Sequence, residues 1–431
     1  MKRYWSIHLF SILLLMTPAS AQTITLAELE RKALQNNPTI GQAKADVDIA
    51  AGFAKQAGLY PNPVLSAVGE EVSGGPVIRG GEFGGGFQQR IVTAGKLGLS
   101  RKSAELGRAI TEESAKAQRQ RVLNAVRTLY YQALSDQYRI RVRTALVQLA
   151  ADAVRVSGEL ANVGQADQPD LLAADVEAQR IQLDLADAVN RRERTWRQLA
   201  AVVNDPSLAA VGLDDDLEMV PRVEIEQALE AIYANSPELR AASIDSDRAQ
   251  TELNRARKDV IPDLLVSGGV RYNRELLETT NGGVLRRPVG PEGFFDIGVQ
   301  IPIFNRNQGN VGAAKAAVER AKLEVDRTKL ALRARLAEAY REYRTSLTRA
   351  DRYKQEVLPK AQRAYELYLS NFRQMAGAYP QALIAQRNLF QLQDAYVDAL
   401  TVVWQRSVEI QGLLLTGGTE IFPPDSARGM R

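Results

Sequence analysis

The sequence predicts a mixed α and β fold in which long antiparallel helical hairpins alternate with pairs of strands, and in which one structural unit occurs twice. The internal two-fold repeat is visible at its start, because residues 26–38, which end in Asn-Asn-Pro, resemble residues 225–237, which end in Asn-Ser-Pro. Matching landmarks stay roughly 200–212 residues apart along the chain. Heptad-like spacing of apolar residues predicts the hairpins, and alternation of apolar and polar residues predicts the strands.

The N-terminal segment, residues 1–21, is expected to be an export signal. Lys2 and Arg3 precede an apolar run at residues 7–16, and residues 19–21 read Ala-Ser-Ala, a small-x-small cleavage site. After this signal, no run of about 18 or more apolar residues follows, so the sequence predicts no transmembrane helix.

The composition excludes most classes of enzyme. The only histidine, His8, lies in the predicted signal, and the chain contains no cysteine. The exported chain therefore cannot form Cys/His zinc sites, histidine-based triads, cysteine nucleophiles or disulfides, and we expect no cofactor. The net charge of +4 becomes +2 when Lys2 and Arg3 are removed, which gives no electrostatic case for nucleic acid.

The first structural repeat is predicted at residues 22–204. A helix beginning near Leu26 is followed by strands at residues 64–72 and 83–92. A long helical hairpin comes next, with its tip at residues 162–170. The first arm of this hairpin contains no proline, and at 1.5 Å per residue it would be roughly 100 Å long.

The second structural repeat is predicted at residues 225–415, with the same order of elements. Its parts are expected as follows: strands at residues 263–273 and 294–303 and a hairpin tip at residues 373–380. An acidic, proline-containing segment, residues 205–224, reads as an equatorial linker between the repeats. Residues 416–431 form a C-terminal tail.

The hairpins carry the apolar seams of a coiled coil. Three sets of residues follow steps of four and three: Val142, Leu146, Leu149, Ala153, Val156 and Leu160; Ala174, Ala178, Ile181, Leu185 and Ala188; and Ala385, Leu389, Leu392, Tyr396, Ala399 and Val403. Such seams indicate helices packed closely along their length, and packing rather than ligand binding is their expected role.

The strands alternate between an apolar and a polar face. Phe83, Phe87 and Ile91 alternate with polar or small residues, and the strands near residues 264–273 and 295–301 follow the same rule. Segments of about ten residues with this pattern are typical of outer-membrane barrels. A small soluble sheet with one wet face alternates in the same way, and the pattern by itself favours that interpretation over the barrel.

Closure of the sheet bears on this choice. Four strands cannot close a barrel, and open sheet edges are not tolerated in lipid. Three copies of the chain would supply twelve strands, an even number within the known range. A trimer would also give the long helices the packing partners that a single chain lacks.

Nearly the whole exported chain resembles the TolC-like outer-membrane factors. The resemblance rests on the Asn-Pro helix start, the strand–loop–strand insert and the long hairpin, all present twice. Residues 303–310, Ile-Phe-Asn-Arg-Asn-Gln-Gly-Asn, and residues 91–96, Ile-Val-Thr-Ala-Gly-Lys, resemble the strand-to-helix junctions of the heavy-metal, CzcC-like branch. The resemblance implies a 12-stranded trimeric barrel in the outer membrane above a periplasmic α-barrel. It also implies a periplasmic adaptor protein and a resistance-nodulation-division pump as partners.

The same resemblance implies roles for individual residues. The family's tip pattern maps onto residues 169–174 of the first hairpin and residues 380–385 of the second. The acids that usually line the constriction on the second hairpin are absent here, and acids occur on the first hairpin instead. Candidate gate residues are Asp167, Asp170, Asp175, Arg373, Tyr379 and Gln381; candidate adaptor-docking residues are Gly164, Gln165, Met375 and Gly377; and candidate barrel-lumen residues are Arg90, Arg271 and Asp296. Asp167 and Asp170 could alternatively serve only as helix N-caps.

Other functions remain open on the sequence. A duct of the same family could serve drug efflux or type I protein secretion. A periplasmic adaptor and a soluble coiled-coil scaffold are further alternatives, although an adaptor would have one hairpin flanked by a β-rich region rather than two strand–hairpin units. The sequence predicts that the protein is not an enzyme but a passive duct through which heavy-metal cations leave the cell.

Overall fold

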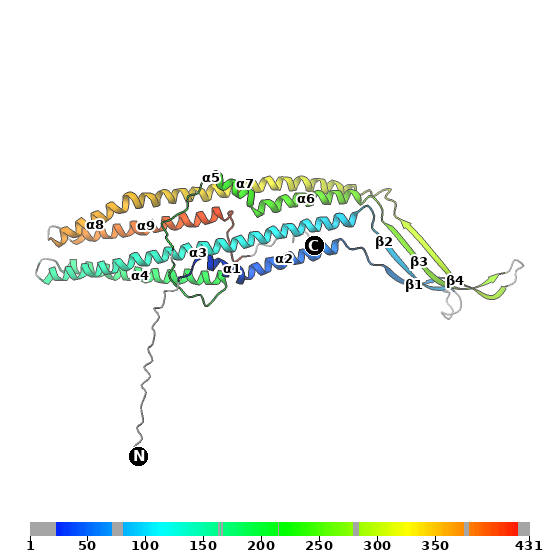
Figure 1. Cartoon of the computed structure of the whole chain (residues 1–431), viewed down its shortest axis with the longest axis horizontal. Coiled ribbons are helices and arrows are strands. Elements are labelled where there is room, and N and C mark those ends of the chain that lie inside the picture. Colours follow the sequence, from blue (N-terminus) through cyan, green and yellow to red (C-terminus); the bar gives the residue numbers. More distant parts are fainter. Residues whose placement is uncertain are drawn as a thin grey trace, which may run out of the picture. The chain divides into compact units, whose positions relative to one another are not determined.

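The computed structural model describes residues 23–70, 81–162, 164, 167–213, 215–278, 284–374 and 379–420. The described chain is mostly helical, with one small sheet (Figure 1). The elements in chain order are α1 (Leu26–Asn36), α2 (Pro38–Ala57), β1 (Val64–Glu70), β2 (Glu82–Ile91), α3 (Lys96–Asn162), α4 (Gln168–Val203), α5 (Ile225–Asn235), α6 (Pro237–Lys258), β3 (Leu264–Glu278), β4 (Val284–Val299), α7 (Gln308–Arg352), the π-helical turn η1 (Tyr353–Val357), α8 (Leu358–Arg373) and α9 (Tyr379–Gln411). The predicted export signal lies outside the described residues.

The chain forms two compact units, and each takes segments from both halves of the sequence. Unit 1 comprises residues 1–37, 123–222 and 341–408, and unit 2 comprises residues 38–122, 223–340 and 409–431. The sheet belongs to unit 2, and the two hairpin tips belong to unit 1. The boundary between the units therefore differs from the predicted boundary between the repeats.

The helices begin and end where local chemistry favours it. α1 starts with a capping box, in which the Thr25 side chain accepts from the Glu28 N–H and the Glu28 carboxylate accepts from the Thr25 N–H. The Ser236 side chain caps α6 by accepting from the Leu239 N–H, and Pro237 occupies the first turn. α3 runs for 67 residues without a proline, and Figure 1 shows it as one continuous ribbon.

The sheet has the strand order β1-β2-β3-β4, and every neighbouring pair is antiparallel. β3 ends at Glu278 and β4 begins at Val284, so both strands are longer than the predicted ranges 263–273 and 294–303 at the loop between them. At this end, β3 and β4 stay paired beyond the segment in which apolar and polar residues alternate. The pairing passes through register shifts between Asn273 and Glu278. At its other end β4 stops at Val299, before the predicted end, since Pro302 has no N–H to donate to a neighbouring strand.

The core of unit 1 follows the predicted heptad seams. Ala174, Ala178, Ile181 and Ala188 of α4 are all at least nine-tenths buried. Leu146 and Ala150 of α3 pack with Ala178 and Ile181 in one cluster. These contacts confirm that the small residues of the seams let two long helices approach closely.

Candidate functional site

One face of the sheet is apolar and exposed. Leu65, Phe87, Gly268 and Phe295 lie opposite one another in register across the four strands. The exposed fraction is 83% for Leu65, 46% for Phe87 and 69% for Phe295. A contiguous patch of large apolar side chains is unfavourable in water. Such a patch is usually covered by lipid or by another protein surface.

The opposite face is polar and centres on Arg271 of β3. Its guanidinium contacts Glu70 of β1 at 2.8 Å, Glu82 of β2 at 2.7 Å and Glu292 of β4 at 3.4 Å. Asn273 donates a hydrogen bond of 2.7 Å to the Glu82 carboxylate. All four strands therefore contribute to one charge cluster, in which three carboxylates surround one guanidinium.

The predicted lumen residues share this polar face. Arg90 pairs across the sheet with Leu265, and Asp296 pairs with Ser267. Positions 265, 267 and 271 of β3 are an even number of residues apart, so their side chains point to the same side of the strand. Paired residues of neighbouring strands share that side, and Arg90, Arg271 and Asp296 therefore lie on one face of the sheet. The structure thus places the three predicted lumen residues on one face of the sheet, with Arg90 paired six positions before Arg271 along β3.

Asp263 anchors the end of the sheet from which α3 starts. Its carboxylate contacts Arg90 at 2.6 Å and Lys96 at 2.7 Å, and it accepts a hydrogen bond of 3.2 Å from the Thr93 N–H. Partial burial raises the pKa of Asp263, but the hydrogen bonds from Lys96 and Arg90 outweigh this effect and lower the pKa to about 2. The carboxylate therefore stays charged and joins the first strand pair to the second.

The strand-to-helix junctions both contain a residue in the left-handed region of backbone space. Ala94 before α3 and Asn307 before α7 each have φ of 60°. Asn307 uses its side chain there, donating a hydrogen bond of 2.8 Å to the Ala256 carbonyl. Asparagine tolerates this conformation better than most residues, which explains its place in the second junction.

The three acids near the first hairpin tip differ in position and exposure. Asp167 is the N-cap residue of α4, but its side chain makes no capping hydrogen bond. Asp170 is half-buried in the first turn of α4 and is not the cap residue, so the interpretation of Asp170 as an N-cap is wrong. Asp175 is exposed, and Gly164 has φ of 71° in the turn.

The second tip is described in part. Gln381 is exposed on the first turn of α9. Arg373 ends α8 and Tyr379 begins α9. Gln165, Met375 and Gly377 lie outside the described residues. For the predicted gate and docking side chains of this tip, the structure therefore describes only the exposure of Gln381.

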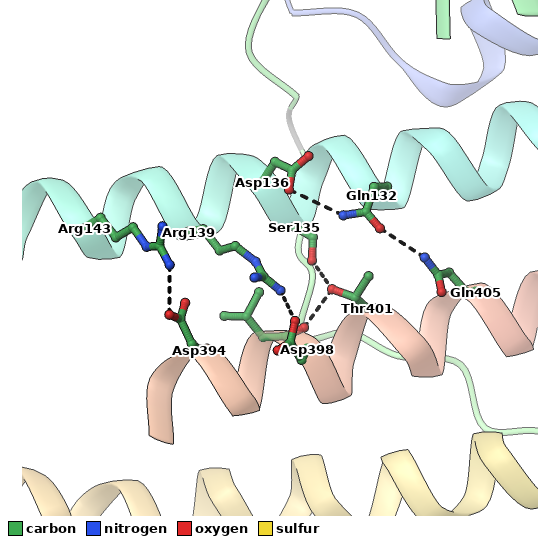
Figure 2. A network of polar contacts seen from close by, with 10 residues as sticks. Gln132, Ser135, Asp136, Arg139, Arg143, Asp394, Asp398, Thr401 and Gln405 are labelled. Carbon is green, nitrogen blue, oxygen red and sulfur yellow. Dashed lines mark hydrogen bonds and ion pairs between the residues drawn. The ribbon is translucent and has the colours of Figure 1, made fainter. Parts of the chain in front are cut away.

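A row of polar side chains joins α3 to α9 and was missed by the sequence analysis. We call the following set the polar ladder: Gln132, Ser135, Arg139 and Arg143 of α3 with Gln405, Thr401, Asp398 and Asp394 of α9 (Figure 2). Arg143 contacts Asp394 at 2.9 Å, and the two glutamines are joined at 3.0 Å. The α3 members recur every three or four residues, so they form one stripe along the helix.

The polar ladder is buried on its α3 side. Ser135 is 0% exposed and Arg139 is 6% exposed. Asp136, the neighbour of Ser135, accepts a hydrogen bond of 2.7 Å from the Thr195 hydroxyl of α4, and burial raises the pKa of this carboxyl. Because a buried charge is costly without its partner, these contacts favour the register in which Arg139 faces Asp398 and Arg143 faces Asp394.

The predicted linker belongs to unit 1 as far as residue 222, and it packs against the helices of that unit. Leu213 and Leu217 are buried. Glu218 contacts Lys354 of η1 at 2.6 Å, and Trp404 of α9 donates a hydrogen bond of 2.8 Å to the Leu217 carbonyl. The segment thus lies against the helices instead of crossing open solvent.

Within the described ranges, none of the helices combines the length and apolar character of a membrane span. The same residues contain no group of three or more acidic, histidine or cysteine side chains that could hold a metal ion. The structure therefore gives no candidate centre for direct metal coordination in its described part.

Comparisons with known proteins identify a family and a relative that resemble this chain. The profile of the family described as outer membrane efflux protein matches residues 29–205 and 228–414. The chain is 25% identical over 395 residues to the cobalt-zinc-cadmium resistance protein CzcC of Cupriavidus metallidurans, covering 92% of this chain and 91% of CzcC.

Two solved structures show the same fold at low identity. The structure of CusC has a TM-score of 0.73 at 16% identity, covering 93% of this chain and 96% of CusC. The outer membrane protein VceC from Vibrio cholerae has a TM-score of 0.72 at 19% identity, covering 92% of this chain and 97% of VceC. With its two matched halves and its TolC-like fold, the chain belongs to the outer membrane efflux protein family and is an efflux channel of the outer membrane that extends into the periplasm.

Proposed function

We propose that three copies of this chain join into one channel whose barrel has twelve strands, four from each copy. The observation that carries the proposal is the apolar face of the sheet, on which Leu65, Val270 and Phe295 are 83%, 69% and 69% exposed. Lipid is the environment that suits this face. The backbone groups at the outer edges of β1 and β4 need partners in hydrocarbon, and pairing β1 of one copy with β4 of the next would supply them.

The helical hairpins would form an α-barrel below the membrane. In the single chain, α4 exposes Leu172 at 56%, Val176 at 65% and Leu183 at 68%. Their spacing of four and seven residues is that of a coiled-coil stripe, which would be covered by a helix of a neighbouring copy. The polar faces of the strands, with Arg90, Arg271 and Asp296, would then line the lumen.

The exported substrate would be heavy-metal cations. This assignment rests on the similarity to CzcC over 92% of the chain. The duct itself would be passive, because it offers a wet, polar path while a partner supplies the energy. The partners would be a periplasmic adaptor, docked at Gly164, Gln165, Met375 and Gly377, and a resistance-nodulation-division pump in the inner membrane. Drug efflux or type I protein secretion is the second candidate within the family.

Deleting the gene and its neighbours separately tests the substrate. We expect raised sensitivity to one or more of zinc, cobalt, cadmium, nickel and copper, restored by the wild-type gene. Sensitivity to drugs or loss of a secreted protein, with unchanged metal sensitivity, would favour the second candidate. Fractionation tests the assembly, since the trimer should require detergent, and a freely water-soluble monomer would contradict it.

A further inference from the structure

The segment between β4 and α7 exposes large apolar side chains. Ile301, Ile303 and Phe304 are 72%, 62% and 91% exposed. The Ile303 N–H donates a hydrogen bond of 3.0 Å to the Ile301 carbonyl, so the chain makes a three-residue turn here and leaves the path of β4. Apolar residues that are this exposed and this close together indicate contact with lipid or with a protein surface outside the chain.

The exposed segment adjoins the apolar face of the sheet. Val299 at the end of β4 lies on that face, four residues after Phe295, and Ile301 follows it by two residues. β3 begins at Leu264, which pairs with Val299, and Ile261 just before β3 is 40% exposed. The apolar surface therefore extends past the last paired residues of both strands, toward the helices (Figure 1).

Three positively charged residues lie beside this segment. Arg257 and Lys258 are in the last turn of α6, and Arg306 lies two residues before α7. The Asn307 side chain donates a hydrogen bond of 2.8 Å to the Ala256 carbonyl. This bond joins the residue next to Arg306 to the residue next to Arg257, so the three charges gather at one junction.

The protein balances these charges only in part. All three residues are exposed, and within the described part of the chain none of them forms an ion pair. The dipole of α6 accounts for Arg257 and Lys258 at its negative end, whereas Arg306 precedes the positive end of α7, where a cation is disfavoured. Asp259, an exposed acid at the C-cap of α6, can offset one of the charges. The junction thus keeps a net positive charge that an external anion would balance.

A neighbouring copy of the chain does not supply this anion. In the proposed barrel β4 pairs with β1 of the next copy, and the chain enters β1 through residues 49–63, which contain Lys55 and no acid. Leu59 and Tyr60 in this range are 51% and 64% exposed, so the next copy offers apolar surface without negative charge. A membrane leaflet offers both acyl chains and negatively charged headgroups.

We propose that the junction between β4 and α7 binds an anionic phospholipid of the periplasmic leaflet. Ile303 and Phe304 lie among its acyl chains, and Arg306, together with Arg257 and Lys258, contacts its phosphate. Apolar residues beside cations suit a membrane interface, because hydrocarbon and charged headgroups meet there. The inference rests on the proposed contact of the apolar face of the sheet with lipid, and it adds the class of lipid and the residues that select it.

Native mass spectrometry of the full chain, purified in detergent, tests the class of lipid with dioleoylphosphatidylglycerol and dioleoylphosphatidylcholine as probes. We expect tighter binding of the anionic lipid, and Arg306→Gln should weaken its binding by about fivefold, the effect of one cation at an anionic membrane surface. Arg333→Gln is the matched control, since Arg333 is exposed on α7, about 40 Å along the helix from its start. Equal binding of the two lipids would overturn the proposal, and so would equal binding by wild type and Arg306→Gln. Displacement of the lipid by inorganic phosphate at equal concentration would show a site for a free anion instead.

Fluorescence quenching tests where the apolar side chains lie. Phe304→Trp, reconstituted in vesicles of brominated phosphatidylglycerol, should lose most of the emission that it adds to wild type, whose Trp196 and Trp404 both belong to unit 1. Val270→Trp reports on the apolar face of the sheet in the same vesicles. Quenching of Val270→Trp alone would overturn this inference and leave the proposed function intact. Quenching of neither variant would contradict the proposed lipid contact of the sheet as well.

Discussion

The first repeat contains one uninterrupted helix, α3, of 67 residues, whereas the corresponding stretch of the second repeat, residues 308–373, is divided into α7, the π-helical turn η1 and α8. The turn has a local cause. Pro359 has no N–H, and its ring would clash with the carbonyl four residues earlier in a regular helix. The Leu358 N–H instead bonds to the Tyr353 carbonyl, five residues earlier, which widens the turn and accommodates the proline.

The strands differ between the repeats as well. Within the described residues, β1 and β2 contain 7 and 10 residues, and β3 and β4 contain 15 and 16. The polar ladder adds a third difference. Counted from the prolines at the two tips, Leu183 is 14 residues after Pro169 and corresponds to Asp394, 14 residues after Pro380. Thus α9 pairs with α3 through charges, while α4 offers an exposed leucine at the equivalent position.

These differences show how one unit, used twice, can serve two purposes. The first repeat supplies a straight helix that is held in register by buried polar contacts. The second repeat supplies a longer strand pair within the described residues and a helix that contains an irregular turn.

The largest effect is expected on the apolar face of the longer strand pair. Val270→Arg would place a charge in lipid at a cost of about 2–4 kcal/mol per copy, and the protein should fail to accumulate in the outer membrane. Ser267→Arg is the control, because Ser267 lies on the polar face opposite Asp296. Leu65→Arg on the shorter strand pair should destabilise the protein less than Val270→Arg. Leu65 lies near the start of β1, and the cost of a charge on the lipid face falls toward the membrane surface. The amount of each of the three variants in the outer-membrane fraction measures the effect. Equal amounts would contradict the proposal that the apolar face contacts lipid.

Moving the proline should interrupt α3 and should make the corresponding helix of the second repeat continuous. Val147→Pro would break α3 near the place that corresponds to Pro359, at a cost of about 3 kcal/mol or more, and Val147→Ala controls for the lost side chain. Pro359→Ala should let residues 353–357 become α-helical and raise the thermal unfolding temperature. Unfolding scans of the purified protein measure both. A π-helical turn that persists in a crystal structure of Pro359→Ala would show that the proline is not its cause.

Asp263 gives an effect of intermediate size with a defined pH dependence. The first repeat has the neutral Pro63 immediately before β1, whereas Asp263 stands immediately before β3. The pKa is lowered from 3.8 to about 2 in the folded state. Stability from this carboxylate is therefore fully present above pH 3.8 and is lost as the pH falls toward 2. The shift corresponds to about 2 kcal/mol.

We therefore expect Asp263→Asn to lower the unfolding free energy by about 2 kcal/mol at neutral pH. The difference from wild type should shrink as the pH falls below about 4, because wild type then loses the same contribution. Asp259→Asn, at the end of α6, is the control for the loss of a carboxylate close to Asp263 in the sequence. Thermal unfolding across this pH range measures the effect, and a difference that does not change with pH would contradict the ion-pair explanation.

Sequence reasoning found the features that depend on local periodicity. Alternation separated an apolar from a polar side in each strand, and heptad spacing selected Ala174, Ala178 and Ile181 as core residues. The polar ladder was missed because Arg139 and Asp398 are 259 residues apart, and no spacing rule pairs residues on separate hairpins. The π-helical turn was also missed, although Pro359 within a helical pattern was a signal that could have found it.

The smallest effect is expected at the tips, where the acids of the two repeats differ. Asp170 follows Pro169 on the first hairpin, and Gln381 follows Pro380 on the second. If the acids at the first tip concentrate cations at the entrance, Asp170→Asn combined with Asp167→Asn should lower cation conductance and selectivity in planar bilayers by roughly twofold, because each trimer loses six charges near one opening. Adding Gln381→Asp should restore part of the current, since it returns a charge at the same level on the neighbouring hairpin. Current and selectivity that stay unchanged in the first variant would remove the acidic entrance. Restoration by Gln381→Asp would show that charge at the tip matters more than which hairpin carries it.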